Sequence, residues 1–486
     1  MAQSMQIKGR VIIYTVHGCP SCVAAKNRLA RLGVPYVEVN LDDYESQERQ
    51  TLVNRTGKRS MPQIFFNGIF VGGYDDLATL KNDELQALVD EVIHYDAPPT
   101  APVVPCIGAI TMGSSLTEHR DRDQYAPVVE DLARSGLIQT HRRGIMLYRK
   151  TFVAEEFVQW LSLNEKYSYD HQEARAVGEE LLRRKFIRRL TPEGDHHQFR
   201  ADAMLYRLLD DEEWEALNAG PVSLNITREA VELSKALQVL MKKIYAQYIS
   251  SGGKTVDYLG IARDPNFKIV ESVAYELQRA RLETLSKEET TAFFINIYNC
   301  IVIHWNVRMG SPGGLLSRGK FFFKARYILG GELYSLGDIE NGILRANSKC
   351  WYWPFRPFSK EDPRLVCAVL DTDPRIHFAL VCGARSCPAI CCYTSEDIDT
   401  QLDMATDAYL EGHDGCQVDV ENKVVTLSRI FKWYKEDFGA SKSQVLQWIY
   451  NHMGHGEKRQ LLGDLLEEGT CQVTYMKYDW ASNGRM

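Results

Sequence analysis

The chain has 486 residues, 45% of them hydrophobic and 25% charged, which is enough apolar material for roughly two to four folded domains. Its net charge of -7 argues against dedicated nucleic-acid binding, and no apolar run reaches the roughly 18 residues that a membrane span needs. The first ten residues lack an apolar stretch, so we expect no signal peptide. The 12 cysteines are then expected to be buried, catalytic or ligating thiols in a reducing, cytoplasmic compartment.

Residues 8–95 alternate strand-like and helix-like stretches. VIIYTV, PYVEVNL, QIFFN and IFVGG read as strands with helical stretches between and after them, an order that predicts a small α/β domain. Residues 96–124 follow as a linker stiffened by Pro98, Pro99, Pro102 and Pro105.

Cys19 and Cys22 stand where the first predicted strand gives way to a helix that ends near Gly33. We expect the Cys19 sulfur to lie over the first turn of this helix, where unpaired N–H groups and the helix dipole favour a thiolate. Cys19 is then the attacking thiolate, and Cys22, one turn later, can resolve the mixed disulfide. A zinc site is the weaker interpretation, because the segment holds no further cysteine.

Residues 8–95 resemble a glutaredoxin in the motifs CPSC, SMPQIFFNG and GGYDDL. The resemblance implies a thioredoxin-like fold, a redox-active disulfide, a cis Pro62 facing the cysteines and glutathione as cosubstrate. An iron–sulfur cluster is left open and is not predicted. The residues implied to bind glutathione are Lys58, Arg59, Met61, Pro62, Gly73, Tyr74 and Asp75, with the two cations on its glycine carboxylate and the last two on its γ-glutamyl end.

Two positions depart from the glutaredoxin pattern. Val16 stands where the family usually has a basic residue, and Ser21 stands where a tyrosine is common. Because a cation is missing at this position, we expect a lower affinity for glutathione than in a typical glutaredoxin.

Residues 125–210 resemble a DEP domain in GIMLYRKTFVAEEFVQWL, ARAVGEELLRRKFIRRL and FRADAMLYRLL. The resemblance implies a winged-helix-like fold and a part in intracellular signal transduction, in which such domains recruit proteins to membranes and receptor complexes. The residues spaced as one buried helical face are Phe152, Phe157, Val158, Trp160 and Leu161.

Basic residues of this second segment suggest a membrane- or partner-binding patch, worth about 1 kcal/mol per cation at an anionic surface. Four of them flank the strand GIMLY, and the other three lie on or just after a helix. They are Arg142, Arg143, Arg149 and Lys150, then Arg183, Arg184 and Lys185. A solvated face is the alternative, because acidic residues nearly balance the basic ones.

Residues 225–486 form a third predicted domain, of the α+β type. Ser286 and Glu289 make a capping box before a helix that is apolar on nearly all sides. YILGGELYSL reads as a hairpin, and DPRIHFALVCGARSCPAI reads as a strand carrying His377 and then a loop with Cys382 and Cys387. FINIYN and RIHFALVCGARSCP resemble family 547 of domains of unknown function over about 264–409, and that resemblance carries no established reaction.

Polar residues of this third domain make up a candidate site with three interpretations. Cys387 or Cys382 could pair with His377 or His304 as a hydrolase-like nucleophile. The four cysteines Cys382, Cys387, Cys391 and Cys392 could bind metal or relay redox equivalents to Cys19, although their spacing matches no standard zinc motif. They could also be buried thiols beside a core network. The candidate residues are His304, His377, Cys382, Cys387, Asn296 and Asn299, of which Asn296 and His304 share one helical stripe with Cys300.

The sequence therefore predicts a multidomain α/β and α+β protein that is a glutathione-linked thiol–disulfide oxidoreductase. Its expected partners are glutathionylated or disulfide-containing proteins and an anionic membrane or receptor complex, with no nucleic acid and no metal. The expected location is cytoplasmic, peripheral to a membrane if the basic patch binds lipid. The rival hypothesis is a redox-sensing scaffold without turnover: Val16 favours it, whereas the intact CPSC pair favours the enzyme.

Overall fold

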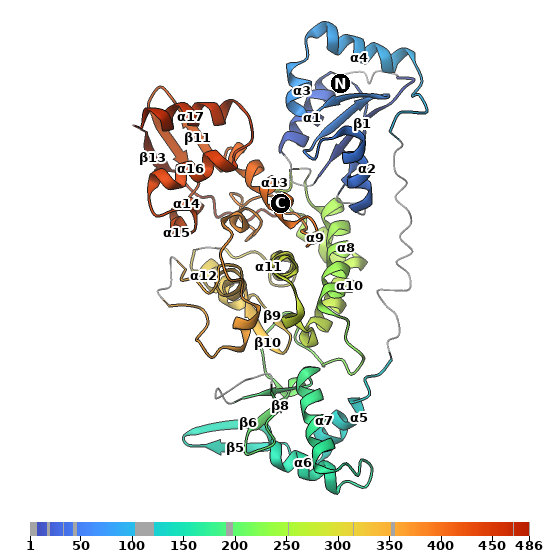
Figure 1. Ribbon diagram of the computed structural model, residues 1–486, viewed down its shortest axis with the longest axis vertical. Helices are drawn as coiled ribbons and strands as arrows, with labels where there is room; N and C mark the ends of the chain where they lie inside the picture. Colours follow the sequence, from blue (N-terminus) through green and yellow to red (C-terminus); the bar gives the residue numbers. More distant parts are fainter. Residues whose placement is uncertain are drawn as a thin grey trace.

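The computed structural model describes residues 7–16, 20–32, 34–41, 46–102, 121–190, 198–250, 252–313, 315–350, 355–469 and 471–485. The first and second domains lie at opposite ends of the molecule, and the helices of the third domain lie between them (Figure 1). None of the described helices has the length and apolarity required to cross a bilayer.

The strands of the first domain form one sheet in the order β2-β1-β3-β4, with β1 and β2 parallel and the other pairs antiparallel. Alternate residues of β1 enter two cores: Val11 and Ile13 pack under α1, α3 and α4, while Ile12 and Tyr14 face α2. The predicted thioredoxin-like order is confirmed, with two closing helices in place of one. The elements are β1 (Val11–Thr15), α1 (Pro20–Arg31), β2 (Val37–Asn40), α2 (Ser46–Thr56), β3 (Gln63–Phe66), β4 (Ile69–Gly72), α3 (Tyr74–Thr79) and α4 (Asn82–His94).

The second domain packs its helices on a sheet of order β5-β6-β8-β7, from which the β5–β6 hairpin projects (Figure 1). Phe152, Phe157, Val158 and Leu161 are buried and Trp160 packs against them, as the helical spacing predicted. The elements are α5 (Ala126–Arg134), β5 (Gln139–Arg143), β6 (Met146–Val153), α6 (Ala154–Leu163), α7 (His171–Arg183), β7 (Ile187–Arg189) and β8 (Leu205–Leu208).

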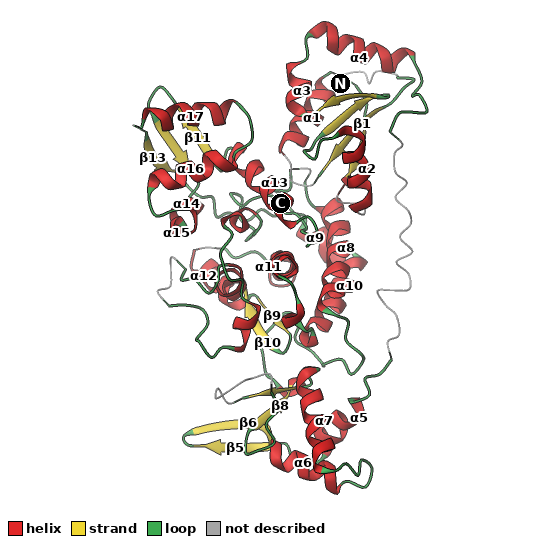
Figure 2. Cartoon of the chain, viewed as in Figure 1, coloured by secondary structure: helices red, strands yellow, loops and turns green. Residues whose placement is uncertain are grey.

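Helices predominate in the third domain, with a β9–β10 hairpin and a β11-β12-β13 sheet at its periphery (Figure 2). Its central helix is α11 (Lys287–Met309), which starts at the predicted Ser286–Glu289 capping box and is buried along most of its length. The remaining elements are α8 (Ala230–Tyr248), α9 (Tyr258–Arg263), α10 (Pro265–Glu276), α12 (Leu315–Lys324), β9 (Arg326–Leu329), β10 (Glu332–Ser335), α13 (Ile398–Glu411), β11 (Cys416–Asp419), β12 (Val424–Leu427), α14 (Ile430–Trp433), α15 (Lys435–Phe438), α16 (Lys442–His452), α17 (Glu457–Glu468) and β13 (Gln472–Tyr475).

The prediction of a strand around His377 is wrong. Residues Pro374–Phe378 form a 3-10 helix, whose first turn is capped by the Asp373 carboxylate. The apolar run that follows is buried against α11 instead of joining a sheet. Asn299 on that helix takes the place of a neighbouring strand, since its side chain donates to Ala379 O and accepts from Val381 N, both at 3.0 Å.

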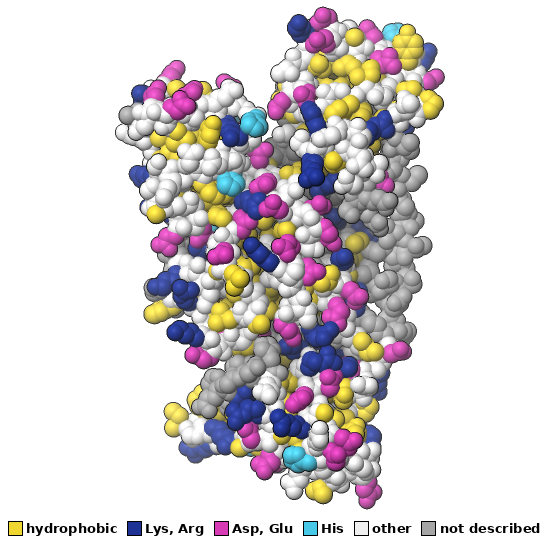
Figure 3. Space-filling model, in the orientation of Figure 1, with side chains coloured by type: hydrophobic (Ala, Val, Ile, Leu, Met, Phe, Trp, Pro, Cys, Tyr) yellow, Lys and Arg dark blue, Asp and Glu magenta, His cyan; other side chains and the backbone are white. Residues whose placement is uncertain are grey.

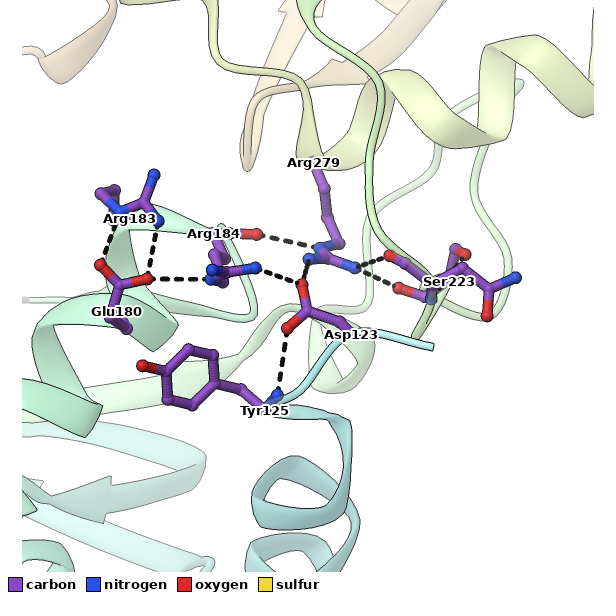
Figure 4. A network of polar contacts seen from close by, with 8 residues as sticks. Asp123, Tyr125, Glu180, Arg183, Arg184, Ser223 and Arg279 are labelled. Atoms are coloured by element: carbon purple, nitrogen blue, oxygen red, sulfur yellow. Dashed lines mark hydrogen bonds and ion pairs between the residues drawn. The ribbon is translucent and has the colours of Figure 1, made fainter. Parts of the chain in front are cut away.

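A buried ion pair joins the second domain to the third (Figure 4). Arg279, just after α10, donates to Asp123 at 3.3 Å, and Asp123 also accepts from Arg184 at 2.9 Å. The Arg279 guanidinium lies 3.5 Å from the centroid of the Phe186 ring and donates to backbone carbonyls, including that of Arg184. Burial lowers the pKa of Arg279 to about 10, so the side chain stays charged at neutral pH.

Replacing Arg279 with methionine tests this junction. Because Arg279→Met leaves Asp123 and several carbonyl oxygens short of a donor, we expect the free energy of unfolding to fall by about 3 kcal/mol in chemical denaturation. Arg281→Met is the matched control: its partner Glu229 is 50% exposed, so the loss should stay below about 1 kcal/mol. Equal losses in the two variants would contradict a structural role for the buried pair.

Candidate functional site

The first of the two predicted redox cysteines, Cys19, lies outside the described residues. Cys22 lies in the first turn of α1 and is buried, in one apolar cluster with Val16 and Met61. Val16 is thus part of the packing beside Cys22, at the position where the glutaredoxin pattern has a cation. The cluster unites the CPSC motif with the SMPQIFFNG motif, which lies about 40 residues further along the chain.

Of the predicted glutathione residues, Met61 belongs to this cluster, whereas Tyr74 packs against the other core of the domain. The Met61–Pro62 peptide bond is cis, as the resemblance implied. Tyr74 begins α3, and Lys58, Arg59 and Asp75 are exposed.

One residue of this region was missed by sequence reasoning. The Asp76 carboxylate accepts from Lys58 Nζ at 2.8 Å and from the Gly73 amide at 2.7 Å. These two hydrogen bonds lower the pKa of Asp76, with Lys58 as the larger cause. An acid three residues after a glycine at a helix start was the available signal, since that spacing caps the helix.

A cavity of about 350 Å³ separates the first domain from the third. Val16, Ser21 and Met61 line it on the side of the first domain. The opposite wall comes from α13 and from the segment that carries Cys391, Cys392 and Tyr393. Met404 of α13 also packs against the cluster around Cys22, so the two domains are in direct contact beside the cavity.

Charged residues of the two domains also meet beside this cavity. Arg49 of α2 lies 3.7 Å from Asp397, just before α13. Burial raises the pKa values of Asp407 and Glu411 on α13, and the negative field of Asp75 on α3 raises them further. The electrostatic balance at this contact therefore includes repulsion between carboxylates of both domains.

A second cavity, of about 240 Å³, lies inside the third domain. His377, Cys382 and Cys387, three of the predicted candidate residues, line it together. Arg318 and Glu340 also line it, and sequence reasoning singled out neither.

His377 is held by a polar network at the edge of this second cavity. Its Nε2 atom lies 2.7 Å from Asp437, and its ring stacks on Tyr434 at 4.0 Å. Arg345 donates to both oxygens of Asp437, at 2.6 and 2.7 Å. Burial alone would raise the pKa of Asp437, but the hydrogen bonds from His377 and Arg345 outweigh it and lower that pKa to about 2.

Cys382 and Cys387 lie side by side, with their sulfur atoms 3.3 Å apart. Cys387 also contacts the Tyr478 hydroxyl and the Ala384 amide, each at 3.4 Å. Burial by itself would raise the pKa of Cys387, but hydrogen bonds from Cys382, Tyr478 and the amide lower it below its ordinary value. The pKa of Cys382 is raised in turn, chiefly by its hydrogen bond to Cys387 and then by burial.

The other predicted residues of the third domain lie elsewhere on α11. His304 is 2.7 Å from the Tyr327 hydroxyl and 3.1 Å from Glu271, and burial lowers its pKa to about 4. His304 is not among the residues that line the cavity, so it is not grouped there with Cys387. Asn296 and Asn299 bind backbone groups and act as positioning residues.

The seven basic residues of the second domain divide into two groups. Arg142, Arg143, Arg149 and Lys150 are exposed on the β5–β6 hairpin. Of these four, Lys150 lies 3.8 Å from Asp211 and 3.4 Å from Glu213. The other three also have acidic partners within the chain: Arg183 pairs with Glu180, Arg184 pairs with Glu180 and Asp123, and Lys185 pairs with Glu283. Arg183 and Arg184 therefore belong to the junction shown in Figure 4.

Within the described ranges, no three His, Cys, Asp or Glu side chains come together in a way that could hold a metal ion.

Comparisons with known proteins divide the chain in the same order as the structure. The family model "Glutaredoxin" matches residues 11–71, "Domain found in Dishevelled, Egl-10, and Pleckstrin (DEP)" matches 137–208, and "Protein of unknown function, DUF547" matches 282–410. The DEP match confirms the predicted second domain, and the third match confirms the predicted family of the last one.

Several curated proteins are similar to the first domain. Glutaredoxin 1 of Rickettsia typhi is 38% identical over 74 residues, which is 15% of this chain and 71% of the relative. A probable glutaredoxin of Synechocystis is 42% identical over 81 residues, 16% of this chain and 73% of the relative. The solution structure of a glutaredoxin from Brucella melitensis covers 19% of this chain and 95% of its own, with 35% identity and a TM-score of 0.16.

The fold and the paired-cysteine motif define the first domain as a thioredoxin-like domain of the thiol–disulfide oxidoreductase class. Through this domain the chain belongs to the glutaredoxin family.

The Asp437 network makes stability depend on acid pH. The folded pKa of about 2 lies below the ordinary 3.8, so this carboxylate stabilises the fold above about pH 4 and loses that contribution, about 2 kcal/mol, as pH falls toward 2. Asp437→Asn should therefore cost about 3 kcal/mol at pH 7, with the gap to wild type narrowing on acidification. Thermal unfolding from pH 2 to 7 measures this. Asp399→Asn, at an 81% exposed position, is the control, and a gap that does not vary with pH would contradict the assignment.

Proposed function

We propose that the first domain is a glutathione-linked thiol–disulfide oxidoreductase. It works in the cavity between the first and third domains, which is called the chamber from here on. The observation that carries the proposal is the convergence of Ser21, from between the two cysteines, and Met61, from the second motif, on one cavity of about 350 Å³. Two separate motifs of the resemblance thus contribute to one hollow of a size suited to a small thiol-bearing ligand.

The proposed reaction is an exchange of thiols. The Cys19 thiolate attacks a mixed disulfide, a sulfur–sulfur bond to Cys19 forms, and the substrate thiolate leaves. A glutathione thiolate then attacks the other sulfur of this mixed disulfide, a new sulfur–sulfur bond to glutathione forms, and the Cys19 thiolate leaves. Alternatively Cys22 attacks the Cys19 sulfur, the bound group leaves as a thiolate, and two glutathione molecules reduce the resulting Cys19–Cys22 disulfide while they are oxidised to glutathione disulfide. Among the residues proposed to bind glutathione, Met61 lines the cavity, and the cations Lys58, held by Asp76, and Arg59 stand in the sequence just before Ser60, which also lines it.

The far wall adds a constraint on the substrate. Because α13 packs against the first domain through Met404, we propose that glutathione and extended disulfide-bearing segments enter the chamber and that a broad folded surface does not. Glutathionylated or disulfide-bonded proteins with accessible flexible segments are then the substrate class.

Replacing each cysteine tests the exchange. With a small glutathione mixed disulfide as substrate and glutathione as reductant, Cys19→Ser should lose about a hundredfold or more in rate, because the attacking thiolate is gone. Cys22→Ser should stay within about tenfold of wild type, since glutathione can resolve the intermediate. A wild-type rate in Cys19→Ser would contradict the oxidoreductase proposal and leave the redox-sensing scaffold as the remaining hypothesis for this domain.

A second function is favoured by the tip of the β5–β6 hairpin. Ile145 is 91% exposed, and Met146 and Leu147 are 58% and 64% exposed. Apolar and basic side chains gather where this hairpin projects (Figure 3), a combination suited to an anionic membrane surface. We propose that the DEP domain docks on an anionic membrane surface through this hairpin. Its apolar tip is flanked by Arg142, Arg143, Arg149 and Lys150.

Vesicle binding by the full chain measures this docking. Binding to vesicles containing phosphatidylserine should exceed binding to phosphatidylcholine alone, and replacing Arg142 and Arg143 with glutamine should weaken it about tenfold or more, at about 1 kcal/mol per cation. Arg183→Gln, which removes a cation already paired with Glu180, is the matched control and should bind like wild type. Equal binding to both vesicle types would show that the hairpin does not dock on an anionic membrane.

A further inference from the structure

The cavity inside the third domain has a mainly apolar, aromatic wall that also includes the buried cation Arg318 and the carboxylate of Glu340, which accepts hydrogen bonds from Tyr298 and Tyr434. Phe322, Trp433, Tyr478 and Trp480 line it, with Ile430 and Leu380 beside them. Such a wall suits the body of a small ligand that is itself aromatic or aliphatic, because burying apolar surface there is favourable without directional contacts.

Arg318 of α12 is the cation of this wall. Its side chain is 3% exposed, and among the residues that the structure describes its two terminal nitrogens have no hydrogen-bond partner. The guanidinium lies 5.6 Å from the centroid of the Trp480 ring, which holds it against the cavity without satisfying its donors. A buried charge that lacks hydrogen bonds is costly, and a carboxylate is the partner that matches the two terminal nitrogens of a guanidinium.

Cys387 lines the same cavity. Its three hydrogen-bond neighbours, Cys382, Tyr478 and the Ala384 amide, all lie at 3.3 to 3.4 Å. Three donors around one sulfur favour the thiolate, which is the nucleophilic form of cysteine. The positive field of Arg318 also reaches the sulfur pair, since it acts on the pKa of Cys382 in the lowering direction.

We propose that this cavity is a second, nucleophilic site, in which Arg318 holds the carboxylate of a small molecule with an apolar or aromatic body and Cys387 attacks an electrophilic carbon of that molecule. The electron pair of the thiolate forms a carbon–sulfur bond, the bond from that carbon to its leaving group breaks, and the leaving group departs with the electron pair. Nothing is oxidised or reduced. Cys382 keeps its proton throughout and hydrogen-bonds to the attacking sulfur.

This site is separate from the glutaredoxin chemistry. It lies within the third domain, it uses neither Cys19 nor Cys22, and its ligand class is set by Arg318 and the aromatic wall. Failure of the oxidoreductase proposal would leave it unchanged.

A pair of alkylating reagents of nearly equal size tests the site in the full chain. Iodoacetate carries a carboxylate and iodoacetamide a neutral amide, and each converts a thiolate to a thioether with release of iodide. The rates at Cys387 are followed by mass spectrometry of the reduced protein. The ratio of the iodoacetate rate to the iodoacetamide rate at Cys387 should be about tenfold or more higher in wild type than in Arg318→Gln, because one charge-assisted contact is removed. Arg318→Lys should recover part of the ratio.

Arg385→Gln is the matched control: this arginine lies on the same loop, two residues before Cys387, and is exposed. Its ratio should equal that of wild type. A test on wild type alone covers the case in which Arg318→Gln fails to fold: phenylacetate should slow the iodoacetate reaction of Cys387, and phenylacetamide should not. An equal ratio in wild type and folded Arg318→Gln, protection by both compounds or neither, or a Cys387 that reacts with neither reagent would overturn the proposal.

Discussion

Two asparagine side chains on one buried helix hold the segment on which both cavities depend. Asn299 of α11 bonds Ala379 O and Val381 N, and Asn296, about one turn earlier, bonds both the carbonyl and the amide of Tyr393 at 2.7 and 2.9 Å. Between these clamps the chain runs without a regular helix or strand. Buried backbone groups need partners, so the two amides replace the ladder that a sheet would have given.

The clamped segment divides the two cavities from each other. Cys387 and Pro388 line the cavity of the third domain, while Ala389, Cys391 and Cys392 line the chamber shared with the first domain. A shift of this loop would therefore alter the wall beside the glutaredoxin motifs and the position of the Cys387 sulfur together. The loop therefore couples the cavity beside the glutaredoxin motifs to the cavity that contains Cys387.

Sequence reasoning predicted the elements whose pattern is local. The alternation of strands in the first domain, the capping box of α11 and the β9–β10 hairpin needed only neighbouring residues. The apolar run after Asp373 was read as a strand because burial against a helix and burial in a sheet produce the same hydrophobic run. The error comes from the asparagine clamps, which act over about 80 residues.

The candidate sites were predictable in part for the same reason. His377, Cys382 and Cys387 share one motif, so their grouping could be expected. Arg318 and Asp437 come from segments about 60 residues away on either side, and nothing in their local sequence marks them. The chamber between the domains exists because α13 packs against the first domain. No local sequence pattern indicates that these two segments come into contact.

Hydrogen–deuterium exchange of residues 379–393 tests the central claim, that the asparagines of α11 fix this loop. In Asn299→Leu the account predicts exchange in that segment at least about tenfold faster than in wild type, with α11 and the first domain unchanged. Asn306→Leu, on the same helix but bonded to Val302 O within it and to Ser311 Oγ just after it, is the control and should leave the segment protected. Unchanged exchange of 379–393 in Asn299→Leu, or equal loss of protection in both variants, would contradict the account.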